Sequence, residues 1–95
     1  MNLDGELALK MGVYRSSGIS DVYIGVIQRI EAGKIAERAR QIIGKELDIV
    51  KRIDSGDASF GMTTYRQEFE KRAEFVQRFE FNCLQLRDFK AKYNL

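Results

Sequence analysis

The segment from Thr64 to Leu95 constrains the fold more than any other part of the chain. Nine positions there follow one another alternately by four and three residues without a change of register, and seven of them are apolar or aromatic, the exceptions being Arg72 and Lys90. Such a heptad row predicts a helix that packs along its length against a partner helix. The row comprises Tyr65, Phe69, Arg72, Val76, Phe79, Cys83, Leu86, Lys90 and Tyr93.

A partner for this helix is available within the same chain. No proline interrupts the 95 residues, and Ser20 followed by Asp21 is a typical helix start, a capping hydroxyl with an acid in the first turn. We therefore expect an all-α fold, a long antiparallel helical hairpin with helices at about 20–53 and 64–94. The turn at 54–63 joins them, and Thr64 with Gln67 matches a capping box at the start of the second helix.

Two interpretations of the first long helix stay open. Its apolar stripe changes register at Gly33, and Gly25 and Gly44 also weaken it, so one interpretation is a helix over 20–53 with a kink or stutter near Gly33. The other places a β-strand at Val22–Ile27, whose β-branched content suits a strand. The first interpretation is preferred, because about 51 Å of helix over 20–53 matches about 46 Å over 64–94.

Residues 1–19 form an N-terminal segment whose pattern fits two periods. Leu3, Leu7, Met11 and Tyr14 lie at helical spacing, whereas alternation around Leu9 suits an extended strand. A short helix capped by Asp4 and ended by Gly12 is favoured.

The pairing of the two long helices follows from the turn. If the turn centres near position 58.5, facing residue numbers total about 117. Phe79 and Phe81 then lie beside Ala36 and Ala39, which pairs large side chains with small ones. A slip by a heptad step would preserve the apolar pattern.

Composition argues against most catalytic chemistry. The chain has no histidine, which removes the commonest general base and metal ligand. Cys83 is the single cysteine, so no intrachain disulfide can form, which fits the cytoplasm or another reducing compartment. No run is long and apolar enough for a membrane span. We expect no enzyme activity, no metal and no cofactor.

Aromatic residues are concentrated in the second long helix, and not all of them lie on the heptad row. Phe75 lies beside the row, whereas Phe81 and Phe89 point away from it. A two-helix hairpin cannot cover both sides, so the N-terminal segment, a second copy or another protein must do so. The sequence therefore predicts an assembly, adaptor or structural subunit that binds a protein partner or forms a homo-oligomer. The expected interface residues are Phe75, Phe81, Phe89, Tyr93, Tyr23 and Ile27.

A row of basic residues on the first long helix supports an alternative function. The row is Lys34, Arg38, Lys45 and Arg52, and it could contact phosphates or an acidic partner. This alternative is a small nucleic-acid-binding or regulatory protein. Glu31, Glu37 and Asp48 flank the row, and the net charge is only +2, so a solvated, ion-paired face is preferred.

Overall fold

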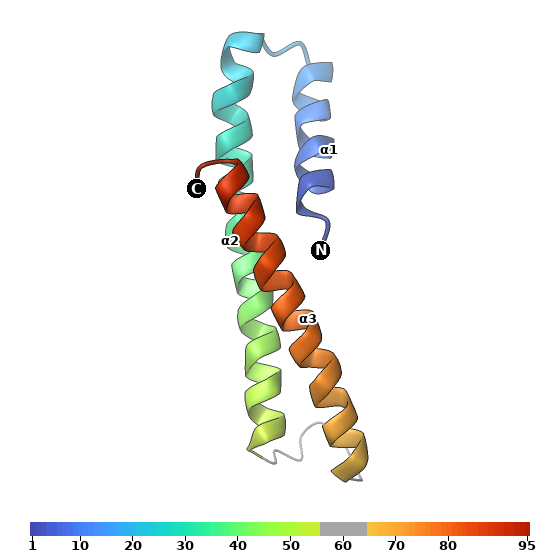
Figure 1. Cartoon of the computed structure of the whole chain (residues 1–95). Coiled ribbons are helices and arrows are strands. Elements are labelled where there is room, and N and C mark those ends of the chain that lie inside the picture. Colours follow the sequence, from blue (N-terminus) through green and yellow to red (C-terminus); the bar gives the residue numbers. More distant parts are fainter. Residues whose placement is uncertain (56–64) are drawn as a thin grey trace.

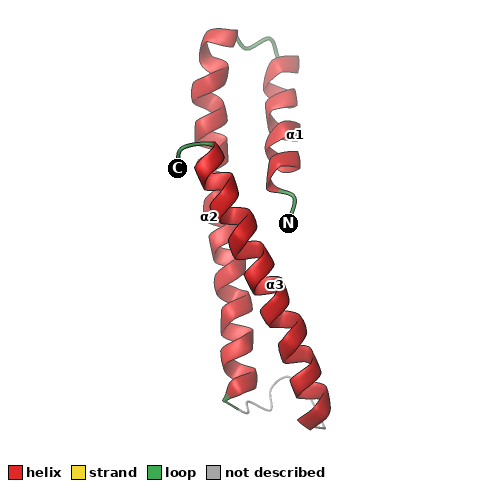
Figure 2. Cartoon of the chain, viewed as in Figure 1, coloured by secondary structure: helices red, strands yellow, loops and turns green. Residues whose placement is uncertain are grey.

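Three helices make up the fold in the computed structural model, which describes residues 1–55 and 65–95 and the side chains of 1–55 and 70–95. They are α1 (Leu3–Ser16), α2 (Asp21–Asp54) and α3 (Tyr65–Lys92), drawn in Figure 1. Figure 2 shows no strand in the described part of the chain. The predicted all-α class is therefore confirmed, and α2 and α3 run antiparallel as the hairpin.

The N-terminal segment is a helix, as preferred, but its limits differ from the prediction. Its cap is Asn2, whose side-chain oxygen accepts a hydrogen bond from the backbone N–H of Gly5 at 2.9 Å. The expected cap, Asp4, lies inside the first turn. The helix also continues through Gly12 to Ser16, because packing of its apolar face outweighs the modest helix propensity of one glycine.

Helix α2 is one helix from Asp21 to Asp54, as preferred, so the alternative strand at Val22–Ile27 is absent. The predicted cap is confirmed, because Ser20 Oγ accepts a hydrogen bond from Val22 N at 3.4 Å. Lys51 and Arg52 lie in the last turn, where cations are favourable.

Helix α3 ends in a Schellman motif. Leu95 N donates to Lys90 O at 2.9 Å and Asn94 N donates to Ala91 O at 3.4 Å, and Asn94 takes the left-handed conformation this motif needs, with φ of 59°. The start of the helix agrees with the prediction to one residue. The predicted capping pair, Thr64 with the Gln67 side chain, lies outside the described residues, as does most of the predicted turn.

One apolar core lies where all three helices overlap. It contains Leu3, Leu7, Met11, Ala32, Ile35, Ala36, Ala39 and Phe89. The helices are staggered: α1 lies along the N-terminal part of α2, and α3 along the remainder (Figure 1). The molecule is consequently long and thin, 58 × 23 × 15 Å, and its radius of gyration is 17.9 Å, against about 13 Å for a compact domain of similar length.

The pairing of α2 with α3 differs from the predicted register. Asn82 lies opposite Glu46 and Arg72 lies opposite Asp54, so each α3 residue meets α2 roughly two to three turns nearer the C-terminal end of α2 than predicted. Phe89, rather than Phe79 or Phe81, packs in the core that contains the alanines. The rule of large against small holds, but in another register.

Candidate protein-interaction surfaces

Two phenylalanines of α3 with opposite exposure mark the first candidate surface. The sequence predicted both as interface residues, but Phe89 is 3% exposed whereas Phe81 is 59% exposed. The sequence left open whether the N-terminal segment, a second copy or another protein packs against Phe89. The N-terminal helix does so, because Leu3, Leu7 and Met11 of α1 share a core with Phe89. Phe89 is thus a core residue in this chain, and the expectation that it faces a partner is corrected.

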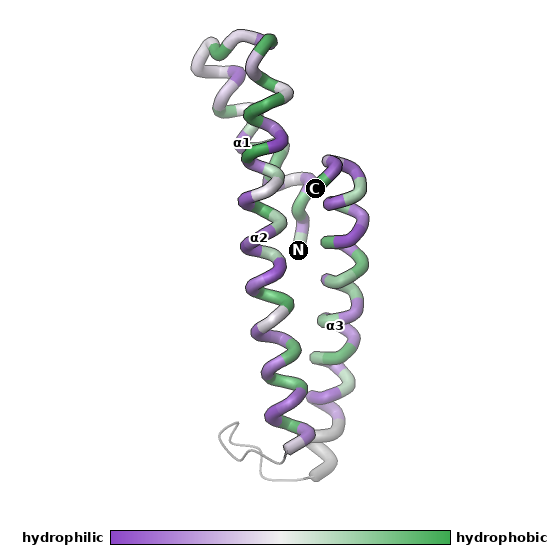
Figure 3. The backbone as a smooth tube through the Cα atoms, turned by 90° about the vertical axis from the view of Figure 1, so that its left-hand side faces the viewer, coloured by the Kyte–Doolittle hydropathy of each residue, from purple (hydrophilic) through white to green (hydrophobic). Residues whose placement is uncertain are grey.

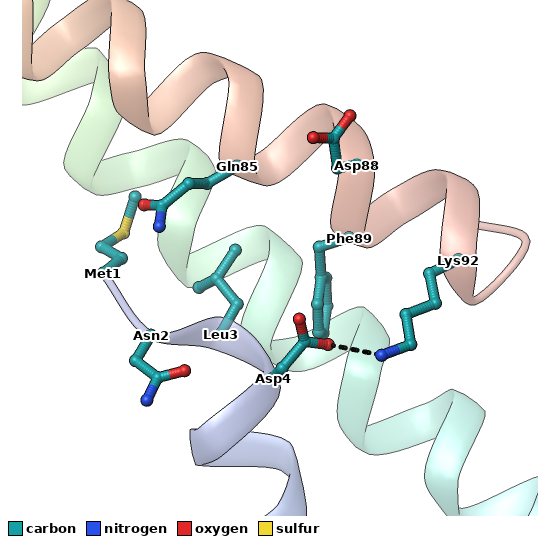
Figure 4. A pocket seen from close by; sticks show the side chains of 8 residues that line it. All are labelled: Met1, Asn2, Leu3, Asp4, Gln85, Asp88, Phe89 and Lys92. Carbon is teal, nitrogen blue, oxygen red and sulfur yellow. Dashed lines mark hydrogen bonds and ion pairs between the residues drawn. The ribbon is translucent and has the colours of Figure 1, made fainter.

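Tyr93 is used in the same contact between α1 and α3. Its ring lies 4.8 Å from that of Phe89, centroid to centroid, and its hydroxyl donates to Asp4 Oδ1 at 3.3 Å. Lys92 forms an ion pair with the same oxygen at 3.3 Å (Figure 4). The carboxylate of Asp4 raises the pKa of Lys92. Tyr93 therefore holds α1 in place, although part of it stays exposed.

The other predicted aromatic residues of α3 lie further from α1. Phe75 is half-buried, and the Arg78 guanidinium lies 5.5 Å from its ring centroid. Phe81 and Leu84 are 59% and 50% exposed, and residues three apart in a helix are neighbours on its surface. We call Phe81 and Leu84 the α3 patch. It is the most exposed aromatic surface of the described part of α3.

A second apolar surface lies on the N-terminal third of α2. Tyr23 is exposed as predicted, but Ile27 is half-buried against the core. Val22, Val26 and Ile30 are 80%, 62% and 53% exposed and follow steps of four residues, so they share one face. We call Val22, Tyr23, Val26 and Ile30 the α2 stripe. The four-residue steps were present in the sequence, but the strand alternative and the register change at Gly33 obscured them.

A shallow hollow of about 550 Å³ adjoins the α2 stripe. It is lined by Gly25, Val26, Arg29, Ile30, Gly33 and Leu95. The Schellman motif places Leu95 here, and Arg29 Nη2 donates to the carbonyl of Asn94 at 3.2 Å. Figure 3 shows that the overlapping helices α1 and α2 extend past the level at which α3 ends. The hollow is therefore the open continuation of the groove that α3 occupies.

The basic row of α2 is partly neutralised. Lys34 Nζ lies 3.5 Å from Glu31 Oε1, and Arg38 pairs with Glu6 of α1. Lys45 and Arg52 are exposed, and neither has an ion pair within the described ranges. The row thus presents two paired and two solvated cations. The sequence placed Glu31 beside it, but Glu6 comes from a helix whose position could not be predicted.

A buried carboxylate joins α1 to α2. Glu31 is 5% exposed and accepts hydrogen bonds from Tyr14 Oη at 2.9 Å and Lys10 Nζ at 3.2 Å. The hydrogen bond from Tyr14, followed by that from Lys10, lowers the pKa of Glu31 below its usual value of 4.5, although burial opposes the change. Glu31 thus serves the docking of α1, and its charge is already matched within the chain.

A second buried polar contact joins α2 to α3. Asn82 is 4% exposed, and its Nδ2 donates to both carboxylate oxygens of Glu46 at 2.9 and 3.0 Å. Towards the other end of α3, Arg72 Nη2 donates to Asp54 Oδ2 at 3.3 Å. A polar contact inside an apolar seam favours one register over others. Arg72, a charged member of the heptad row, therefore meets a partner within its own chain.

A small pocket lies where α1 meets α3. Figure 4 shows its lining residues, among them Met1, Asp4, Gln85 and Lys92, around a volume of about 230 Å³. Gln85 Oε1 is buried there without a hydrogen-bond partner. Within the described residues no group of three or more acidic, cysteine or histidine side chains is placed to hold a metal ion. Those residues also contain no helix of the length and apolarity that a bilayer crossing requires.

Comparison with known proteins adds no functional information. The chain matches no protein-family model, no curated protein and no solved structure. Function must therefore be inferred from the surfaces themselves. The apolar side chains that the described residues leave exposed include the α3 patch, the α2 stripe and, on α1, Leu9 and Val13, which are 76% and 70% exposed. The α3 patch is the one of these on the aromatic-rich helix.

Proposed function

We propose that this chain is a non-enzymatic assembly or adaptor subunit that binds a protein partner through the α3 patch. The single observation that carries this proposal is the exposure of Phe81, a large aromatic side chain that is 59% exposed beside an exposed Leu84. Aromatic residues at the centre of an apolar patch contribute much of the binding energy in protein interfaces. The same helix buries Phe89, which is 3% exposed, so exposure is a property of Phe81 and not of every aromatic residue of α3.

The proposal is also supported by the staggered shape. A chain 58 Å long and 15 Å thick presents much surface for its mass, which suits a subunit that bridges or lines other proteins. The chain has no histidine, and the described residues with lowered or raised pKa values are matched in ion pairs or hydrogen bonds. Neither feature suggests a general acid or base.

Site-specific photo-cross-linking tests the proposal. A photoreactive amino acid replaces Phe81 in one variant and Leu9, an exposed apolar residue of α1, in the control. We expect position 81 to give a discrete adduct with a partner protein in cells of the native host, and Leu9 to give none. Equal labelling from both positions, or no adduct from position 81, would contradict the proposal.

The alternative, binding of nucleic acid through the basic row, is less well supported. Lys34 and Arg38 would have to leave Glu31 and Glu6 to contact phosphates. Binding through phosphates weakens steeply with added salt, whereas burial of the α3 patch should be nearly insensitive to it. A salt titration of any purified complex therefore separates the two functions.

A further inference from the structure

The outer face of α2 changes character along its length. Its first three turns present the α2 stripe, which is apolar, whereas the same face past Gly33 carries charged residues, Glu37, Arg40, Asp48 and Lys51. The apolar side chains are therefore confined to one segment. Isolated exposed apolar residues need no explanation, but a contiguous patch bounded by charges is typical of an interaction site.

The position of the patch indicates the shape of its occupant. The hollow beside the α2 stripe shares Gly33 and Leu95 with the neighbouring pocket between α2 and α3, so it is continuous with an interface in which one helix packs on another. A helix laid along α2 beyond the end of α3 would extend that interface. Helix α1 does not obstruct it, because α1 binds Glu31 on roughly the opposite side of α2.

The surface also permits close approach. A Cβ atom added to either Gly25 or Gly33 would meet nothing within 4 Å, so the two glycines leave space rather than serve a contact within the chain. Of the six residues that line the hollow, only Arg29 is charged, and it already donates to the Asn94 carbonyl. The other five lining residues are glycine or apolar, so most of the hollow suits an apolar partner.

The stripe is complementary to itself. Val22, Val26 and Ile30 are evenly spaced, so an antiparallel copy of the same helix centred on Val26 sets Val26 against Val26 and Val22 against Ile30. A two-fold interface needs this property, because the same patch must serve both partners. We propose that the α2 stripe is the contact between two copies of this chain, packed antiparallel about Val26. This contact is separate from the α3 patch and does not depend on its function.

The geometry sets the expected strength of the contact. The α2 helices would overlap over residues 21–31, about 15 Å of helix, which is shorter than the helix pairs inside the monomer. Interfaces below the standard size are usually weak or transient. We expect a dimer with a dissociation constant on the order of 10–100 μM, so the monomer predominates in dilute solution.

Sedimentation equilibrium over about 1 μM to 1 mM tests this proposal. Val26→Asp would bring two carboxylates together at the two-fold axis and should raise the dissociation constant at least about tenfold. Val13→Asp is the matched control, because Val13 is 70% exposed on α1 and lies outside the stripe. It should change the constant less than about twofold. A chain that stays monomeric throughout, or dimers that survive Val26→Asp, would overturn the proposal.

Cysteine cross-linking tests the antiparallel arrangement. In a Cys83→Ser background, Val26→Cys should form an intermolecular disulfide readily, because the pairing brings the two Val26 positions face to face. Val13→Cys should form one at least about ten times more slowly. Similar rates for the two variants would overturn pairing about Val26. Phe81→Asp should leave both assays unchanged, so failure of the dimer and failure of the α3 patch are distinguishable.

Discussion

In the middle of the molecule three helices overlap, whereas at each end only two helices lie side by side. The middle buries Phe89, Leu7 and Met11 almost completely, while the ends leave Val22 and Val26 exposed. The residue types are similar, so the difference comes from the stagger of the helices. A two-helix pair cannot cover apolar side chains on both sides of one helix. Stability is therefore concentrated in the middle, and the ends are free to serve contacts.

Substitution of matched phenylalanines should give the largest difference between the two regions. Phe89→Ala removes a fully packed ring and should lower the free energy of unfolding by about 3–5 kcal/mol. Phe81→Ala removes an exposed ring and should change it by less than about 0.5 kcal/mol. Urea unfolding followed by circular dichroism measures both. Comparable losses in the two variants would mean that the α3 patch contributes to folding.

Loss of the buried amide should have the next largest effect, and it concerns the α2–α3 contact away from α1. Asn82→Ala leaves the Glu46 carboxylate buried without its donor and should cost about 2–3 kcal/mol. Replacing both residues by leucine should recover most of this loss, because a buried polar pair often contributes little net stability. If Asn82→Ala were as stable as the parent, the Glu46 carboxylate would have to be hydrated in the variant.

A fall in pH should weaken the packing of α1 on α2. We expect this effect on stability to be smaller than those of the Phe89 and Asn82 substitutions. The pKa of Glu31 is lowered in the folded chain, so its contribution is complete above the unfolded pKa of about 4.5 and is lost as the pH falls through the folded value. Glu31→Gln lacks this contribution at every pH. The urea midpoint of the parent should therefore fall more steeply below about pH 5 than that of Glu31→Gln. Parallel pH profiles would contradict a role for the ionised carboxylate.

Much of the helix layout could be predicted from the sequence, because it depends on local signals. Ser20 caps α2 as expected, and the absence of proline allowed a helix through Gly33. The limits of α1 were less predictable. Asn2 takes the capping role assigned to Asp4, and the turns beyond Gly12 are held by packing that only the folded chain provides.

The candidate surfaces were only half predictable, because burial depends on register. A shift by whole heptads keeps apolar residues on the seam, so periodicity alone could not decide which aromatic residue meets the alanines of α2. Polar contacts such as that of Asn82 with Glu46 distinguish one register from another. The position of Glu46 among apolar residues of the first long helix was a sign of such a contact. Phe81 and Tyr23 were expected at the surface and are exposed. Phe89 was also expected there, but it is buried in the core.

The uncovered ends can be tested as contact surfaces in one photo-cross-linking measurement on the intact chain. The photoreactive residue is placed at Val26, at Phe81 or at Asp48, which lies on the charged continuation of the face that carries the α2 stripe. We predict an adduct of twice the chain mass from position 26, an adduct with a different protein from position 81, and none from position 48. Equal adducts from all three positions, or none from 26 and 81, would contradict the assignment of these surfaces to protein contacts.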